Sequence, residues 1–523
     1  MTDQAGTRPA VNPWIVAIAV MASTFMVVLD STVVNVSLPH IAGDLSATVD
    51  EATWTLTAYL AANAVILPMT GWLASLFGRK RLLLLSTGGF TLTSLLCGLA
   101  PTMPVLVVLR ILQGITGGTL QPISQAVLLE AFPPAERGKA MSFWGLGVVV
   151  APILGPVLGG WLTDNYSWRW VFYINIPVGI AALALTKAYI TDPPYLKRGT
   201  GGIDYRGLSL LAIGIAALQI VLDKGQEEDW FASGLIVVLT VMAVVAMVAF
   251  IWNEMRARHP IVDLRVFRHV SYSTGTVIMA LVMFVLFGSM VLLPVMLQTL
   301  MGYPAIEAGK AMAPRGIGSF LGMLFVGAVS SRVDHRKLLA VGLVGAGASM
   351  FWLGAITLDA GFWDLFWPQF LQGLALSLLF VPLTTLTMDA IAPEEMGNAT
   401  SLYNLVRNVG GSFGIATATT LLSRYGQVNL DRLATHVTPY SPAATGMLHD
   451  LTGAFVSRGS DLVTAQQQAM AALYGMTARQ ASAITFLQVF RVLGILCLVL
   501  LPLVLVLKKP RHLGSGTVHV VAE

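Results

Sequence analysis

Two charged residues lie deep inside apolar segments near the start of the chain, where together they could handle a proton. Asp30 lies eight residues before the end of the segment Trp14 to Leu38, and Arg110 lies six residues after the start of Pro104 to Leu128. At about 1.5 Å per residue, both side chains lie roughly 9 to 12 Å from the same membrane face, if the two segments are antiparallel helices. Burial favours the protonated form of a carboxylate and a nearby cation favours the ionised form, so such a pair can bind and release a proton as its surroundings change. A static structural ion pair is the alternative.

The segment around Arg110 carries polar and small residues along one helical face. They recur at helical spacing and comprise Arg110, Gln113, Gly114, Gly117, Gln121, Ser124 and Gln125. Lipid cannot satisfy such groups, so this stripe must face a water-filled cavity or the bundle interior. Weaker stripes occur in Trp54 to Ala74 and in Ala399 to Leu422. We therefore expect a substrate cavity lined by Tyr59, Asn63, Gln113, Gln121, Asn404 and Arg407. Amides that only bond helices together are the alternative, which does not explain an arginine.

Small residues and prolines recur on one face of the segment Ala140 to Leu162. They are Gly147, Pro152, Gly155, Pro156, Gly159 and Gly160. Small residues four positions apart allow close helix packing, and the prolines weaken the hydrogen-bond ladder. We expect a bent, closely packed helix that can seal the seam between two bundles. Packing without a transport role is the alternative.

Residues suited to catalysis or metal binding do not group in the sequence. The two cysteines lie in apolar segments, and all eight histidines fall in loops or at segment ends. No Ser/His/Asp set or pair of intramembrane carboxylates is present for hydrolysis. We therefore expect no enzyme, no metal, no cofactor and no nucleic-acid partner.

The elements that position these residues are membrane-spanning helices. Hydrophobic residues make up 55% of the 523, and only 11% are charged, which does not fit the surface of a soluble protein. About fourteen segments approach the length of about 20 apolar residues that a span needs, from Trp14 to Leu38 through to Ile484 to Leu507. The sequence predicts an all-α integral membrane protein embedded in the lipid bilayer.

The loops between these segments differ in charge from one side to the other. One set carries Arg79, Lys80, Arg81, Arg137, Lys139, Lys197, Arg198, Arg206, Arg256, Arg258, Arg265, Arg268, Arg332, Arg336 and Lys337, and the tail adds Lys508, Lys509 and Arg511. The opposite short loops carry only Arg169 and Lys224. The positive-inside rule then predicts that both termini are cytoplasmic, in agreement with an even number of spans. The long polar segment 423–483 would lie outside.

An internal repeat indicates two bundles. Gly71 to Arg81 (GWLASLFGRKR) is matched loosely by Gly327 to Lys337 (GAVSSRVDHRK) at the corresponding hairpin of the second half. We expect a six-helix bundle in 1–190, two inserted helices with cytoplasmic loops in 191–270, a second six-helix bundle in 271–507 and a cytoplasmic tail in 508–523. A short cytoplasmic loop that merely gained basic residues is the alternative.

Four motifs resemble those of the major facilitator superfamily, in its fourteen-helix drug:proton antiporter branch, the EmrB/QacA family. They are LDSTVVNVSLP (Leu29 to Pro39), LRILQGITGG (Leu109 to Gly118), APILGPVLGGWLTDNYSWRWVFYINIPVG (Ala151 to Gly179) and GNATSLYNLVRNVGGSFGIA (Gly397 to Ala416). The third resembles the antiporter signature and its continuation. With the helix count, the resemblance covers nearly the whole chain.

The resemblance implies the major facilitator fold and export of lipophilic drugs or toxic organic compounds, coupled to a proton gradient by alternating access. It implies that Gly71, Gly78 and Arg79 form a gating loop, although Ser75 stands where the family usually has an acidic residue. The segment between the last two spans is similar to that of EmrB-type pumps. Such pumps work with a periplasmic adaptor (membrane fusion protein) and an outer-membrane channel, in the bacterial cytoplasmic (inner) membrane. An importer or uniporter of a polar metabolite, or a sensor or scaffold, are the rival functions.

Two finer expectations concern the substrate and the outer segment. The deep charged residues are mainly basic, namely Arg110, Arg315, Arg407 and Arg491, so we expect neutral or weakly acidic lipophilic substrates. The stretch Val463 to Ala483 is free of proline and rich in Ala, Gln and Met. It should extend the last helix outward and help to dock the adaptor.

Overall fold

The computed structural model describes residues 12–133, 136–192, 204–257, 260–330, 332–389 and 391–507, and these are almost entirely helical. Lys197, Arg198, Arg258 and the tail 508–523 lie outside the described residues, as does the side chain of Pro156. Among the described residues, twelve helices are long and apolar enough to cross a membrane, and one bent pair gives a thirteenth. The fourteenth expected span is α16 (Met396–Ala434), which is long but carries buried polar residues.

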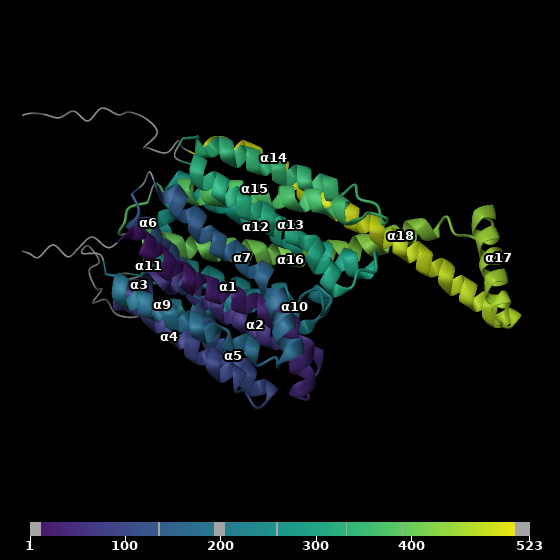
Figure 1. The fold of residues 1–523 in the computed structure, drawn as a ribbon, viewed down its shortest axis with the longest axis horizontal. Helices are drawn as coiled ribbons and strands as arrows, with labels where there is room; N and C mark the ends of the chain where they lie inside the picture. The colour runs from purple at the N-terminus through teal and green to yellow at the C-terminus, as the bar shows by residue number, and fades with distance from the viewer. Residues whose placement is uncertain are drawn as a thin grey trace, which may run out of the picture.

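The first bundle holds six spans packed side by side (Figure 1). They are α1 (Pro13–Asp44); α2 (Val49–Ile66) continued by η1 (Leu67–Met69) and α3 (Thr70–Phe77); α4 (Arg79–Gly98); α5 (Met103–Gly117) with α6 (Leu120–Ala131); α7 (Arg137–Asn165); and α8 (Trp170–Tyr173) with α9 (Asn175–Tyr189). Local sequence fixes several ends. Thr48 and Glu51 form a capping box that starts α2, and Gly78, at φ +82°, separates α3 from α4.

The second bundle repeats this plan after a pair of inserted helices. The pair comprises α10 (Tyr205–Lys224) and α11 (Gly234–Arg256); the short helix η3 (Trp230–Ala232) contacts α11, and η4 (Leu264–Arg268) contacts α12. The bundle comprises α12 (Val270–Thr299), α13 (Ala305–Val329), α14 (His335–Leu353), α15 (Phe362–Met388), α16, and α18 (Leu462–Val499) with α19 (Leu501–Val506). The fold is therefore all-α, with two six-helix bundles and two inserted helices, as the sequence predicted.

The two faces of the molecule differ in shape. We call the face at which α1 begins the terminal face, and the opposite one the arm face. At the arm face α16 and α18 continue beyond the bundles and, with α17 (Pro442–Ser457), form a projection that we call the arm (Figure 1). Helix α18 runs unbroken from Leu462, so the prediction that Val463 to Ala483 extends the last helix is confirmed. No residue of α17 is buried, so the arm is an appendage to the core.

Helix α7 is bent. Its two parts, Arg137–Pro152 and Val157–Asn165, meet at 41°. The bend falls where Pro152 and Pro156 remove backbone donors from the helical ladder, which agrees with the expectation from the sequence.

Helix α10 connects the two bundles in the half of the molecule near the arm face. Its Asp223 accepts a hydrogen bond from Thr57 of α2, and Lys224 Nζ donates to Thr53 Oγ1 at 3.0 Å. On its other side, Gln219 Nε2 donates to Ser412 Oγ of α16 at 3.2 Å. Because these contacts are polar and reach both bundles, the inserted pair is part of the helical core as well as of the apolar surface.

Candidate functional site

The carboxylate of Asp30 is the centre of a buried hydrogen-bond network in the first bundle. Asp30 and Arg110 are both 0% exposed, and Arg110 Nη1 donates to Asp30 Oδ2 at 2.6 Å. The other carboxylate oxygen, Oδ1, accepts from Gln113 Nε2 at 3.1 Å and from Asn175 Nδ2 at 2.7 Å. The structure therefore brings together the two residues that the sequence singled out, from α1 and α5. Hydrogen bonds to both carboxylate oxygens offset part of the cost of burying this charge pair.

Arg110 also has partners other than the carboxylate. Its Nε donates to the Thr55 carbonyl oxygen at 3.2 Å, and Nη1 donates to Gln113 Oε1 at 2.7 Å. The guanidinium carbon lies 4.1 Å from the centre of the Tyr59 ring, which is a cation–π distance. Its Nη2 is buried without a hydrogen-bond partner among the described residues. The cation is thus held by α2 and α5 even when the carboxylate is discounted.

Asn175 is a functional residue that the sequence analysis did not single out. It lies at the start of α9, is 0% exposed, and donates from the same Nδ2 to Asp30 Oδ1 and to Ser94 Oγ at 3.0 Å. Ser94 in turn donates to the carbonyl oxygen of Phe172 at 2.8 Å. An asparagine inside an apolar segment is a usable signal, and this one stands within the quoted motif that ends in INIPVG. The network therefore draws on α1, α4, α5 and α9.

A second polar cluster joins the two bundles. Arg407 Nη2 of α16 donates to Gln121 Oε1 of α6 at 2.7 Å, and Asn404 Nδ2 donates to Gln125 Oε1 at 2.6 Å. Gln121 lies eleven residues after Arg110, or about 16 Å along the helix axis toward the terminal face. Arg407 is 5% exposed, and none of the ion pairs among the described residues includes it. It is a buried cation held by neutral groups.

The other residues predicted to line the substrate cavity are Tyr59, Gln113 and Asn63, and they lie in or near the Asp30 network. Tyr59 and Gln113 belong to the Asp30 network and are at most 1% exposed. Asn63 is half-buried on α2. Helices α2 and α5 lie close together here, since a Cβ added at Gly114 or Gly118 would come within 3 Å of a backbone atom of Tyr59 or Asn63. That the six residues line one substrate cavity stays a prediction.

The glycine face of α7 packs mainly against α1 of its own bundle. A Cβ at Gly155 would meet Thr32, one at Gly159 would meet Val33, and one at Gly147 would meet Met21, each within 3 Å. Gly160 has more room, and Pro152 is half-buried. Helix α7 contacts the second bundle nearer the terminal face. There a Cβ added at Gly138 would contact the Ser330 side chain, and one added at Gly327 would contact the Ser142 side chain.

The predicted gating segment, from the start of α3 through Gly78 to the start of α4, also contacts the second bundle. Gly71 N donates to Ser401 Oγ of α16 at 3.1 Å, and a Cβ on Gly71 would lie 2.7 Å from the backbone of Asn398. Arg79 forms an ion pair with Glu130 at the end of α6. Asp192 Oδ1 accepts from Lys80 N at 2.8 Å and lies against Gly78. Carboxylates from two other segments therefore serve this loop, whereas Ser75 only donates to the Trp72 carbonyl oxygen of its own helix.

The direct contacts between the two bundles lie mainly in one half of the molecule. Among the described residues, the hydrogen bonds that directly join the first bundle to the second are Gly71 to Ser401, Asn404 to Gln125 and Arg407 to Gln121. All three lie between the middle of the spans and the terminal face. The ring of Trp144 in α7 also stacks on Phe380 of α15, with centroids 6.1 Å apart. The bundles are thus locked together on the terminal side.

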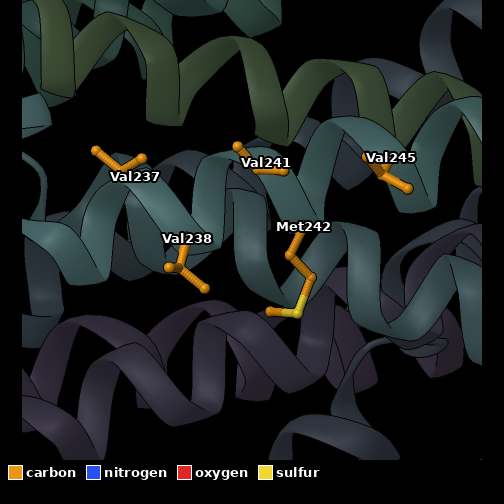
Figure 2. A pocket seen from close by; sticks show the side chains of 5 residues that line it. All are labelled: Val237, Val238, Val241, Met242 and Val245. Carbon is orange, nitrogen blue, oxygen red and sulfur yellow. The ribbon is translucent and has the colours of Figure 1, made fainter.

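A shallow hollow on α11 is a lipid-facing surface feature. Figure 2 shows it lined by Val237, Val238, Val241, Met242 and Val245 of this one helix. Their side chains are apolar, and Val238 is 63% exposed, as expected for a helix that faces hydrocarbon. With no polar group to orient a solute, this hollow does not compete with the two polar clusters as a functional site.

The fold and the buried ion pair define a multi-pass membrane transporter of two six-helix bundles. The chain belongs to the Major Facilitator Superfamily, whose family model matches residues 20–415. Multidrug export protein EmrB of Escherichia coli strain K12 is 39% identical over 504 residues, which cover 96% of both chains. Fatty acid resistance protein FarB of Neisseria gonorrhoeae is 37% identical over 518 residues, or 98% of this chain and 99% of that one. The predicted relationship to EmrB-type export proteins is confirmed.

A solved structure supports the same fold. The human organic anion transporter MFSD10 superposes with a TM-score of 0.58 over 94% of this chain and 100% of its own. At 15% sequence identity, this similarity concerns the fold alone.

Proposed function

We propose that the protein is a proton-coupled antiporter that exports lipophilic drugs or toxic organic compounds by alternating access. The observation that carries the proposal is the Asp30 carboxylate, wholly buried and hydrogen-bonded by donors from α5 and α9. A carboxylate at such a site changes its protonation when its partners move, because its charge is balanced only by Arg110. The names of the EmrB relatives, which are multidrug export proteins, support drugs as the exported compounds.

In this proposal the structure represents the state that is open toward the arm face. The locked terminal half would prevent return of the compound, while protons reach Asp30 from the arm side. Protonation would weaken the bond from Arg110 Nη1 to Asp30 and so loosen α1 from α5, while Arg110 keeps its other partners on α2 and α5. The bundles would then close on the arm side, where α10 bonds to both of them. The proton gradient is the energy source, so the cycle needs no cofactor and no catalytic chemistry.

The terminal face is cytoplasmic in this proposal, in the cytoplasmic (inner) membrane of a bacterium. The basic loops at that face, including Arg79, Lys80 and Arg81, support this orientation. We retain as proposed domains residues 1–190, 191–270, 271–507 with its periplasmic part 423–483, and the tail 508–523. The proton relay would not need an acidic residue at Ser75, because Glu130 pairs with Arg79.

The proposed substrates are neutral or weakly acidic lipophilic molecules. Arg110 is neutralised by Asp30, and Arg491 is exposed at the surface and donates to the Gly354 carbonyl oxygen, so neither adds a free charge to the interior. Arg315 on α13 is half-buried and takes part in none of the ion pairs among the described residues, and Arg407 is a cation held by neutral groups at the seam between the bundles. It would attract a carboxylate and repel a dication. The name of the relative FarB, a fatty acid resistance protein, supports the acidic part of this range.

The arm supports a further part of the proposal, the docking of a periplasmic adaptor that leads to an outer-membrane channel. Helices α16, α17 and α18 form a projection beyond the two bundles that a partner outside the membrane could contact (Figure 1). Exposed Tyr474 and Met470 on α18 are 63% and 59% accessible. Aromatic residues and methionine are enriched at protein interfaces.

Reconstitution in vesicles tests the function directly. Purified protein would be placed in liposomes with an imposed pH gradient, and a fluorescent lipophilic dye would report transport. Dye should move against the inward proton flow, and a protonophore should abolish the movement. Gradient-independent uptake of a polar metabolite would instead show an importer or uniporter, and no flux of either kind would show a sensor or scaffold.

A further inference from the structure

A crevice of about 380 Å³ lies between α16 and α18 at the base of the arm. Its walls combine two arginines, Arg432 and Arg491, with the apolar side chains of Tyr425, Val428, Val492 and Ile495. The volume falls in the range of small-molecule pockets, about 300 to 1,000 Å³. None of these six residues takes part in the Asp30 network or in the cluster around Arg407.

The position of the crevice along the membrane normal follows from the neighbouring helix α14. Arg491 Nε donates to the carbonyl oxygen of Gly354 at 2.9 Å, and Gly354 directly follows α14. The 19 residues of α14 span about 28 Å, close to the thickness of the bilayer hydrocarbon. Arg491 therefore lies at the membrane boundary on the arm face. Val492 and Ile495 follow it along α18 toward the membrane interior, and Arg432 lies on α16 where that helix has entered the arm.

The two arginines lack acidic partners. None of the ion pairs among the described residues includes Arg432 or Arg491. Asp431, next to Arg432 in the chain, is exposed and does not line the crevice. Two guanidinium groups close to one crevice repel each other unless an anion lies between them.

Buried Asn429 and half-buried Gln488 supply polar groups to the crevice wall. Asn429 is 5% exposed, and its Nδ2 donates to Thr485 Oγ1 and to Gln488 Oε1, each at 2.9 Å. These bonds fix α16 against α18 and hold the crevice in shape. The site is therefore preorganised and does not depend on loop movement.

We propose that the crevice binds an anionic phospholipid from the leaflet on the arm face. The phosphate would lie between Arg432 and Arg491, because guanidinium groups match phosphate geometry and remain charged at any physiological pH. One acyl chain would cover Val492 and Ile495, which are 40% and 52% exposed toward the lipid. Basic pockets between membrane helices recognise lipid headgroups in this way. A bound lipid would tie the bases of α16 and α18 together and so set the direction of the arm.

Lipid binding to the purified full-length protein tests this proposal without any transport measurement. Delipidated protein in detergent would be titrated with phosphatidylglycerol, phosphatidylcholine, oleate or inorganic phosphate, and native mass spectrometry would count retained molecules. The test variant is Arg432→Gln with Arg491→Gln. The matched control is Arg424→Gln with Arg458→Gln, which removes the same charge from exposed arginines outside the crevice. The melting temperature of each lipid-free variant would establish that it is folded, and Arg432→Gln alone serves if the double variant is not.

We expect one tightly retained phosphatidylglycerol per chain, little retention of phosphatidylcholine or free phosphate, and weaker binding of oleate. The double variant should bind phosphatidylglycerol roughly thirty-fold more weakly, because each basic residue near an anionic lipid surface contributes about 1 kcal/mol. The control pair should bind like the wild type. Equal retention of both phospholipids, preference for oleate or phosphate, or unchanged binding by folded variants would overturn the proposal.

Discussion

Replacing Asp30 with Asn should abolish proton coupling and lower stability by a measurable amount. Asparagine keeps the size of aspartate and one acceptor oxygen, but it cannot take up or release a proton at physiological pH. The change strands the Arg110 cation inside the bundle, since both residues are 0% exposed. Breaking a buried pair by removing one partner costs about 3 to 5 kcal/mol.

The structure places the expected cost at the lower end of that range, about 3 kcal/mol. Arg110 would keep its bonds to the Thr55 carbonyl oxygen and Gln113 Oε1, and its contact with the Tyr59 ring. The new amide could still accept a hydrogen bond from the guanidinium, although its NH2 group would face the donors of Gln113 or Asn175. We expect a folded protein with a lower melting temperature that still binds substrate.

A charge-neutral double variant separates coupling from folding. Asp30→Asn combined with Arg110→Gln removes both charges, so it should recover most of the lost stability while remaining unable to couple. The assays are substrate-induced proton release from purified protein, dye transport under a pH gradient, and melting temperature. Proton release by Asp30→Asn at the wild-type level would remove Asp30 from the mechanism. Recovery of gradient-driven transport in the double variant would show that the pair is structural only.

The other predictions concern the terminal lock, the substrate and the arm. A disulfide between Ser142→Cys and Gly327→Cys should form on oxidation, because a Cβ on Gly327 would lie 3.3 Å from Ser142 Cβ. The disulfide should stop transport until it is reduced. Transport that continues in the fully cross-linked protein would contradict a terminal half that opens and closes. Arg407→Gln should weaken export of lipophilic carboxylic acids by about tenfold and leave export of a neutral dye nearly unchanged, since a hydrogen bond to a charged partner is worth about 1.5 kcal/mol. Equal losses for both compounds would refute the charge preference. Faster export of dications than of acids by the wild type would also refute it. Replacing α17 (Pro442–Ser457) with a Gly/Ser linker should abolish adaptor pull-down and cellular resistance. Dye transport in vesicles should be preserved, because no residue of α17 is buried. Retained pull-down and resistance would show that this helix does not dock the adaptor.

Much of the fold could be predicted because lipid restricts what a spanning segment can be. A chain in hydrocarbon must satisfy its backbone within each helix, so long apolar segments such as Val270–Thr299 predict spans almost directly. The segment Ala399 to Leu422 was predicted as one of the apolar spans, and α16 covers it, although α16 carries many buried polar residues and is not among the twelve helices apolar enough to cross a membrane. The outward extension of α18 followed from helix propensity and the absence of proline.

The candidate site was only partly predictable. Asp30 and Arg110 could be paired in advance because each is a charge at matching depth, and a lone charge in lipid requires a partner. Glu130 and Asp192 escaped notice because acids near helix ends are ordinary features of a sequence, and Asn175 did so although an asparagine in an apolar segment is a usable signal. Their roles depend on which helices become neighbours. The glycines of α7 show the same limit, because spacing predicts close packing but does not say which helix is packed against.

The sequence by itself determined that the surroundings are lipid, the approximate number of spanning helices, and the need for Asp30 and Arg110 to meet, because these follow from local composition and from the free energy of burying charge. The tertiary structure alone decided that Asn175 completes the carboxylate site, that α10 bonds to both bundles, and that the direct hydrogen bonds between the bundles lie in the terminal half of the described residues. These features arise from contacts between segments far apart in the chain, such as Gly71 with Ser401, whose formation depends on how whole helices pack. Local pattern carries no information about that choice.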